Sequence, residues 1–259
     1  MKIPLYQVDA FTSKVFSGNP AAVCPLERWL PDKQMQAIAM ENNLSETAFF
    51  VKKEGHYELR WFTPKIEVDL CGHATLASAY VFFNFIDQTA HSVSFKTKSG
   101  MLQVNREGDL LAMNFPSRKA NPCPIPEQLI QGLGEQPEEV LLARDYLVVY
   151  DSEDKVRSLK PNMNLLLKNE ALGTIVTATG KNSDFVSRFF APKVGIPEDP
   201  VTGSAHSTLI PYWSDKLGRK KLYARQISSR SGELFCEDLG DRVKIAGKAV
   251  RYSEGFLEL

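Results

Sequence analysis

The segment from Ala74 to Phe85 constrains the fold most, because apolar or small residues occupy nearly every position in it. As a helix it would have almost no polar face, so it has to be enclosed rather than lie on a surface. Strand-type segments with alternating polarity accompany it in the sequence, for example around Val93 and Phe95. A curved sheet wrapped around this helix satisfies both patterns.

A second apolar helix is expected from Ser204 onward, through the run 209–213. The segment before it, Glu198–His206, resembles Asp69–Thr75 before the first helix: each carries a Gly, a polar residue and an Ala where the helix begins. We interpret this as a weak internal repeat. The sequence therefore predicts an α+β fold of two pseudo-symmetric lobes, each a curved, mostly antiparallel sheet around a central helix.

The boundary between the lobes is expected in the segment Pro116–Pro126, which contains four prolines. This gives an N-terminal lobe at 1–117 and a C-terminal lobe at 118–259, with the last strand free to return to the first lobe. Free N–H groups and the positive dipole end make each helix start an anion site. Two such starts that face one cleft would hold an anionic substrate between them.

The overall composition narrows the possible partners. The 259 residues contain 31 Lys and Arg against 31 Asp and Glu, which gives no electrostatic reason to expect nucleic acid or an anionic membrane as a partner. No apolar run approaches a membrane span, and residues 1–4 do not begin a signal peptide. The four cysteines are scattered, as is typical of free thiols, so a cytoplasmic protein is expected.

Six separated motifs occur in order along the chain: Asp9–Phe11, Phe16–Val23, Asn43–Phe49, Arg60–Pro64, Leu70–Thr75 and Glu198–Ala205. In these motifs the chain resembles the PhzF-like proteins of phenazine biosynthesis, a branch of the diaminopimelate epimerase-like fold. The resemblance implies two lobes with a cleft between them, a homodimer and no cofactor. The family's type enzyme isomerises trans-2,3-dihydro-3-hydroxyanthranilate by moving a proton along a conjugated ring.

The resemblance also implies roles for individual residues. Glu46 matches the acid/base glutamate and His73 the active-site histidine. Asp199 and Ser204 match further active-site residues, and Asn19 lies in a turn that lines the substrate side. We further expect the amides near Gly72 and Gly203 to hold the carboxylate of a small cyclic or amino-acid-like substrate.

Each of these residues also has a plain structural interpretation. Glu46 could begin an edge strand and face water, although a buried carboxyl could hold and return a proton. His73 lies in a first helical turn, where the dipole favours the neutral ring. Asp199 could orient His73 or a substrate amine, or be an ordinary helix-start carboxylate. Ser204 could bind a carboxylate, cap the helix, or both, and His206 is expected to be structural.

Other kinds of site are possible in the same sequence. Epimerases of this fold use two thiols, and Cys71 occupies the place of the first, but the second place is expected at Pro200, which carries no proton. A Ser-His-Asp hydrolase triad lacks the nucleophile-elbow motif. No local pair has the usual zinc-ligand spacing, so no metal site is expected. A non-catalytic small-molecule-binding protein of the same fold is the remaining alternative.

Overall fold

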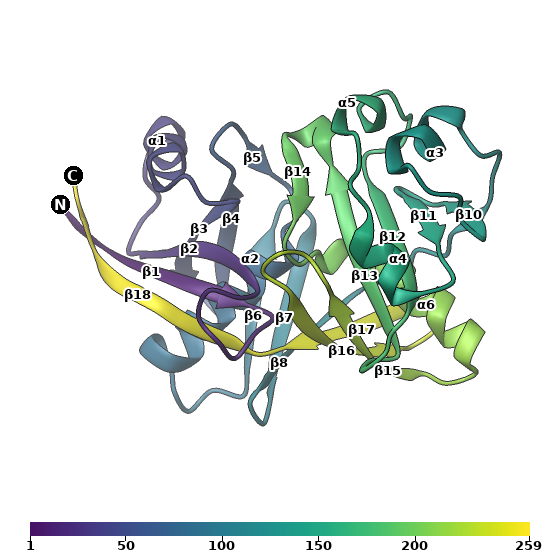
Figure 1. Cartoon of the computed structure of the whole chain (residues 1–259). Coiled ribbons are helices and arrows are strands. Elements are labelled where there is room, and N and C mark those ends of the chain that lie inside the picture. Colours follow the sequence, from purple (N-terminus) through teal and green to yellow (C-terminus); the bar gives the residue numbers. More distant parts are fainter. The chain divides into compact units, whose positions relative to one another are not determined.

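The computed structural model describes all 259 residues, which divide into two compact units. Unit 1 comprises Met1–Asn114 and Ala246–Leu259, and unit 2 comprises Phe115–Ile245. The sequence placed the boundary at 117/118 and left the last strand free to return to the first lobe. The last strand, β18 (Ala249–Glu258), pairs antiparallel along β1 (Lys2–Ala10) within unit 1, as Figure 1 shows in yellow and purple.

Unit 1 is a mixed sheet with two helices and a π-helical turn. Besides β1 and β18, its elements are β2 (Asn19–Leu26), α1 (Asp32–Asn42), β3 (Glu46–Lys53), β4 (His56–Phe62), β5 (Glu67–Val68), α2 (Gly72–Val81), η1 (Phe82–Ile86), β6 (Ser92–Thr97), β7 (Gly100–Glu107) and β8 (Leu110–Pro116), whose end passes into unit 2. The strands pair in the order β18-β1-β2-β3-β4-β6-β7-β8, and only β2–β3 and β4–β6 are parallel.

Helix α2 lies at the centre of unit 1. All of its residues except Gly72 and Tyr80 are buried, and it contacts β1, β2 and β3. Small side chains such as Ala74 and Ala77 let the helix approach the sheet closely. The helix was expected to continue to Phe85, but regular α-helix ends at Val81, and the following turn leaves Phe85 partly exposed. The enclosure expected of an all-apolar helix is confirmed.

Unit 2 is built in the same style, around helix α6 (Gly203–Leu217). Its other elements are β9 (Asn121–Pro122), α3 (Glu127–Leu133), β10 (Glu139–Leu142), β11 (Tyr146–Val149), α4 (Glu153–Ser158), α5 (Met163–Leu166), β12 (Thr174–Thr179), β13 (Phe185–Ala191), η2 (Pro192–Val194), β14 (Ile196–Asp199), β15 (Lys221–Gln226), β16 (Gly232–Asp238) and β17 (Arg242–Gly247), whose end passes into unit 1. Within this sheet β11–β12 and β13–β15 are parallel.

Helix α6 accommodates a proline in its interior. Pro211 has no N–H for the carbonyl of Ser207, and the backbone N–H of Arg118 donates to that carbonyl instead, at 2.9 Å. Mixed parallel and antiparallel strands with a central helix in each unit confirm the α+β class. None of the helices combines the length and the apolar character that a membrane crossing requires.

Candidate active site

The starts of two neighbouring parallel strands place Asn19 and Glu46. Asn19 is the first residue of β2 and Glu46 the first of β3, and Glu46 pairs with Ala21. Gly18 has a φ of +66°, and a Cβ there would lie 2.2 Å from the carbonyl oxygen of Ala10. Only glycine fits this turn, so the Gly-Asn-Pro motif fixes where Asn19 enters the sheet.

The start of α2 supplies the other members of the group. Cys71 is the extended N-cap residue of α2, and His73 lies in the first helical turn. Thr75 Oγ1 donates to the Cys71 carbonyl at 2.6 Å, which fixes the helix start. Because α2 packs on β2 and β3, this start lies beside Asn19 and Glu46.

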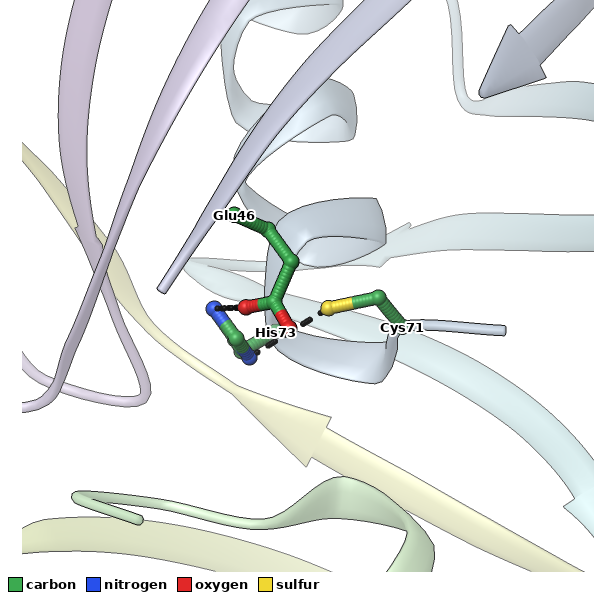
Figure 2. A group of neighbouring side chains, drawn as sticks. All are labelled: Glu46, Cys71 and His73. Atoms are coloured by element: carbon green, nitrogen blue, oxygen red, sulfur yellow. Dashed lines mark hydrogen bonds and ion pairs between the residues drawn. The ribbon is translucent and has the colours of Figure 1, made fainter. Parts of the chain in front are cut away.

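His73 connects all of these groups (Figure 2). Its Nε2 lies 3.0 Å from Glu46 Oε2, and its Nδ1 lies 3.5 Å from Cys71 Sγ. The Asn19 amide nitrogen also lies 3.2 Å from Nδ1. All four residues are buried, with Glu46 8% exposed and His73 5% exposed. The interpretation of Glu46 as a water-facing strand end is therefore wrong.

The protonation of His73 is set by competing effects. Burial lowers its pKa, whereas negative charge on Cys71 and on Glu46 raises it, and the raising effects dominate, so the pKa lies well above 6.5. Burial, followed by the charge of Glu46, raises the pKa of Cys71 to about 11, so this thiol keeps its proton at neutral pH. We therefore assign the shift of His73 to the Glu46 carboxylate. The helix dipole favours the neutral ring, whereas the Glu46 carboxylate, 3.0 Å from Nε2, acts in the opposite direction and raises the pKa of His73.

Asn19 is suited to both states of the ring. A neutral His73 with its hydrogen on Nε2 accepts from the Asn19 amide nitrogen that faces Nδ1. A charged His73 carries hydrogen on both nitrogens, so Asn19 must then present its amide oxygen.

Glu46, Cys71 and His73 could in principle hold a metal ion, because one ligand atom from each lies within 4.8 Å of the others. However, Glu46 contacts Nε2 whereas Cys71 contacts Nδ1, so the two partners meet opposite sides of the ring. A bound metal would also need the thiolate, which burial disfavours. The donor set fits an ion pair and a thiol contact on opposite sides of one ring better than it fits one ion.

The remaining predicted residues, Asp199, Gly203 and Ser204, lie in unit 2. Asp199 is buried at the end of β14 and accepts a hydrogen bond from Thr202 Oγ1. Gln226 supports this turn, since it donates to the Asp199 carbonyl at 2.7 Å and accepts from the Thr202 N–H at 2.8 Å. Gly203 is the first residue of α6, and the partly exposed Ser204 follows it.

His206 has the structural role that was expected. It is fully buried, and its Nδ1 donates to the Thr202 carbonyl at 2.8 Å. Burial lowers the pKa of His206 to about 4, despite this hydrogen bond, so the ring is neutral at physiological pH. The bond repeats the one that joins Thr75 to the N-cap carbonyl of α2.

The two helix starts show which residues correspond. Cys71 and Thr202 are the extended N-cap residues, and each precedes the first glycine of its helix. The position equivalent to Cys71 is therefore Thr202, not Pro200 as expected from the sequence. Thr202 carries a hydroxyl that already donates to Asp199, so this position also lacks the second thiol of an epimerase.

Two contributors were missed at the sequence level. Gln226 lies in β15 and Arg144 between β10 and β11, both far in sequence from the motifs they contact. No local spacing marks either residue, since each reaches the α6 start only through the folded sheet. Their side-chain types alone gave no signal.

The family model described as phenazine biosynthesis-like protein, PhzC-PhzF, matches residues 8–255. The chain belongs to the PhzF family. It is 52% identical to an uncharacterized isomerase of Pseudomonas aeruginosa, with 100% of both chains covered, and 48% identical to one of Halalkalibacterium halodurans, with 96% of both covered. The chain is therefore an isomerase of this family.

Solved structures agree with this assignment to the PhzF family. The crystal structure of a PhzF-family protein from Enterococcus faecalis matches with a TM-score of 0.98 and 46% identity over 100% of both chains. A predicted epimerase of Pseudomonas aeruginosa matches with a TM-score of 0.77 and 18% identity, over 98% of this chain and 99% of the other. The second likeness shows the fold alone, and it confirms the diaminopimelate epimerase-like architecture.

Proposed function

We propose that this chain is a cofactor-independent isomerase in which Glu46 moves a proton on a small carboxylated substrate, cyclic or amino-acid-like. The observation that carries the proposal is the buried pair of Glu46 and His73, whose Oε2 and Nε2 lie 3.0 Å apart. A buried carboxylate held by a histidine is a typical acid/base arrangement.

The pair supports proton transfer as follows. His73 holds one carboxylate oxygen of Glu46, so the other oxygen is left to approach a carbon-bound hydrogen of the substrate. Glu46 takes that proton while the C–H electron pair moves into the conjugated system, and it returns the proton at a second carbon. His73 orients the carboxylate throughout, and the Asn19 amide contacts Nδ1 of the ring on its other side.

Substrate binding is assigned to the two helix starts. The first amides of α2, at Gly72 and His73, would hold a carboxylate from unit 1. Asp199, Gly203 and Ser204 belong to unit 2, and their action on the same substrate stays a prediction. A homodimer likewise stays a proposal that sedimentation can test.

The two-thiol racemase gains no support. It needs a thiolate on one side of the substrate carbon and a thiol on the other, whereas burial keeps Cys71 protonated and Thr202 stands at the corresponding position. Cys71 instead acts as a small group that contacts His73 Nδ1.

Solvent exchange tests the proposal. The chain is incubated in D₂O with trans-2,3-dihydro-3-hydroxyanthranilate and a panel of small cyclic carboxylates, and deuterium incorporation is followed by mass spectrometry. Glu46→Gln should lower incorporation by about 10²- to 10⁴-fold, which is the usual contribution of a general acid/base. Glu54→Gln, at an exposed turn carboxylate, is the matched control and should keep the wild-type rate.

Unchanged incorporation in Glu46→Gln would rule out the assignment. A wild-type chain that binds panel members without any incorporation would instead support the non-catalytic alternative. Circular dichroism of each variant establishes that a lost rate does not reflect unfolding.

A further inference from the structure

A pocket of about 690 Å³ lies in unit 1, where β1 begins and where β2 and β3 end. We call it the η1 pocket, because Ile86 at the end of η1 forms part of its wall. Its volume lies within the range of about 300–1,000 Å³ that is typical of small-molecule sites. All of its lining residues belong to unit 1, so unit 1 forms it without a contribution from unit 2.

The η1 pocket is separate from the candidate active site. Glu46, Phe50 and Lys52 lie at even spacings on β3, so their side chains share one face of the sheet. Glu46 starts the strand beside His73, whereas Phe50 and Lys52 line the pocket near the end of the strand. Six residues of strand span about 20 Å. One small molecule therefore cannot contact both Glu46 and Lys52.

Aromatic contacts fix the inner wall of the η1 pocket. The Tyr57 ring packs edge-on against Phe50 and against Phe82 of η1, with ring centroids 5.6 and 5.2 Å apart. Pro25 pairs with Phe50 across β2 and β3, and it lines the pocket as well. Regular α-helix ends at Val81, and η1 continues it as a π-helical turn, a feature that is frequent at functional sites. The inner wall therefore offers a preformed apolar surface.

The charged lining of the η1 pocket is mainly basic. Arg28 and Lys52 are exposed, and their side chains form no hydrogen bond or ion pair within the protein. Lys2 also lines the pocket, but it pairs with Glu258 at 3.4 Å. Glu27 is the one acidic residue of the lining. One anion against two unpaired cations leaves a side-chain charge of +1, which suits one monoanion.

Tyr57 supplies a third donor to the η1 pocket. It is the direct cross-strand partner of Lys52, so the two polar ends reach the same part of the lining. Burial, followed by the charge of Asp87, raises the pKa of Tyr57, so its hydroxyl keeps its hydrogen at neutral pH. Asp87 itself accepts from Thr89 and Ala90 and forms no ion pair with Lys52. Both Tyr57 and Lys52 can therefore donate to a bound molecule.

We propose that the η1 pocket binds a small monocarboxylate with an apolar body, at a place outside the candidate active site. The apolar body packs against the wall formed by Phe50 and the Tyr57 ring. The carboxylate accepts charge-assisted hydrogen bonds from Arg28 and Lys52, and the Tyr57 hydroxyl is the third donor. A doubly charged phosphate ester would exceed the local charge, so a carboxylate is the better match.

Calorimetric titration with a matched pair of probes tests the η1 pocket. Octanoate carries the carboxylate, whereas 1-octanol has the same chain length without the charge. Wild-type chain should bind octanoate more tightly than 1-octanol. The double variant Arg28→Gln/Lys52→Gln should weaken octanoate binding about 10-fold or more, as expected for hydrogen bonds to a charged group, and leave 1-octanol binding unchanged. Both positions are exposed and unpaired, so the fold does not depend on them.

Two single variants sharpen the test. Tyr57→Phe keeps the ring and removes the hydroxyl, so it should weaken octanoate binding about fivefold and leave 1-octanol binding close to the wild-type value. Lys65→Gln is the matched control, because Lys65 is exposed, forms no ion pair and follows β4 at the end opposite Tyr57. It should bind both probes as wild type does.

Four results would overturn the proposal: octanoate bound no more tightly than 1-octanol, wild-type octanoate affinity in the double variant, equal weakening of both probes there, or octyl phosphate bound more tightly than octanoate. Sedimentation at several protein concentrations adds a fifth, because octanoate binding lost on self-association would show that a second copy covers the pocket. Glu46→Gln should bind octanoate as wild type does while it loses deuterium exchange, so this proposal and the proposed function can fail independently.

Discussion

Replacement of Glu46 by Gln should lower the pKa of His73, because it removes the negative charge beside the ring. Two unit charges 3.0 Å apart interact by about 5 kcal/mol at an effective dielectric constant of about 20. Glutamine keeps the size of the side chain and offers at most a neutral hydrogen bond worth about 1 kcal/mol. Burial then dominates, so the pKa of His73 should fall from above 6.5 to below it.

The same substitution should change how stability depends on pH. In the wild type the pKa of folded His73 is raised, so its contribution is complete below about pH 6.5 and is lost as pH rises through the folded value. In Glu46→Gln the folded pKa is lowered, so stability is lost as pH falls below about 6.5. The difference in unfolding free energy between the two proteins should therefore widen as pH falls from about 8 to 6.

NMR of the imidazole groups measures the pKa directly, because the chain has only 4 histidines and single substitutions assign each signal. Glu46→Asp is the control that keeps the charge, and its His73 should still titrate above 6.5. Urea unfolding at several pH values gives the stability. A His73 pKa in Glu46→Gln equal to or above the wild-type value would refute the reasoning.

Three further outcomes are expected. Burial lowers the pKa of His206 to about 4, so the contribution of this residue to stability is complete above pH 6.5, and about 3 kcal/mol of it is lost as pH falls toward 4. The variant His206→Asn can still donate to the Thr202 carbonyl, and it should remove this pH dependence from the unfolding free energy measured in urea. An unchanged slope between pH 6.5 and 4 would contradict the assignment. Gly18→Ala should lower the unfolding free energy of the protein by about 2 kcal/mol or more, because the backbone there is left-handed and the new Cβ would lie 2.2 Å from the Ala10 carbonyl oxygen. A thermal unfolding midpoint equal to that of the wild type would show that the turn relaxes freely. Cys71 should react with iodoacetamide at pH 7 at least about 100-fold more slowly in the folded protein than in the urea-unfolded protein, because burial raises the pKa of its thiol to about 11. Mass spectrometry measures the labelling rates, and equal rates in the two states would exclude a buried thiol.

Local pattern and motif resemblance predicted much of this protein. The apolar segment from Ala74 required an enclosed helix, and the Gly-Ser and Gly-His segments marked two helix starts. Such features depend on residues that are neighbours in the chain, so the sequence displays them directly. The motif around Glu46 also identified the family, which the comparisons confirm.

Tertiary structure alone decided the state of the candidate site. Glu46, His73 and Asn19 are separated along the chain, and only the pairing of β2 with β3 under α2 brings them within hydrogen-bond distance. The helix dipole, read from the sequence, favours a neutral histidine, whereas the Glu46 carboxylate beside the ring raises its pKa. The contact of Arg144 with Ser204 likewise depends on the folded sheet, and no sequence motif marks it. Charge interactions depend on distance in space and on burial, and neither quantity is contained in the order of the residues.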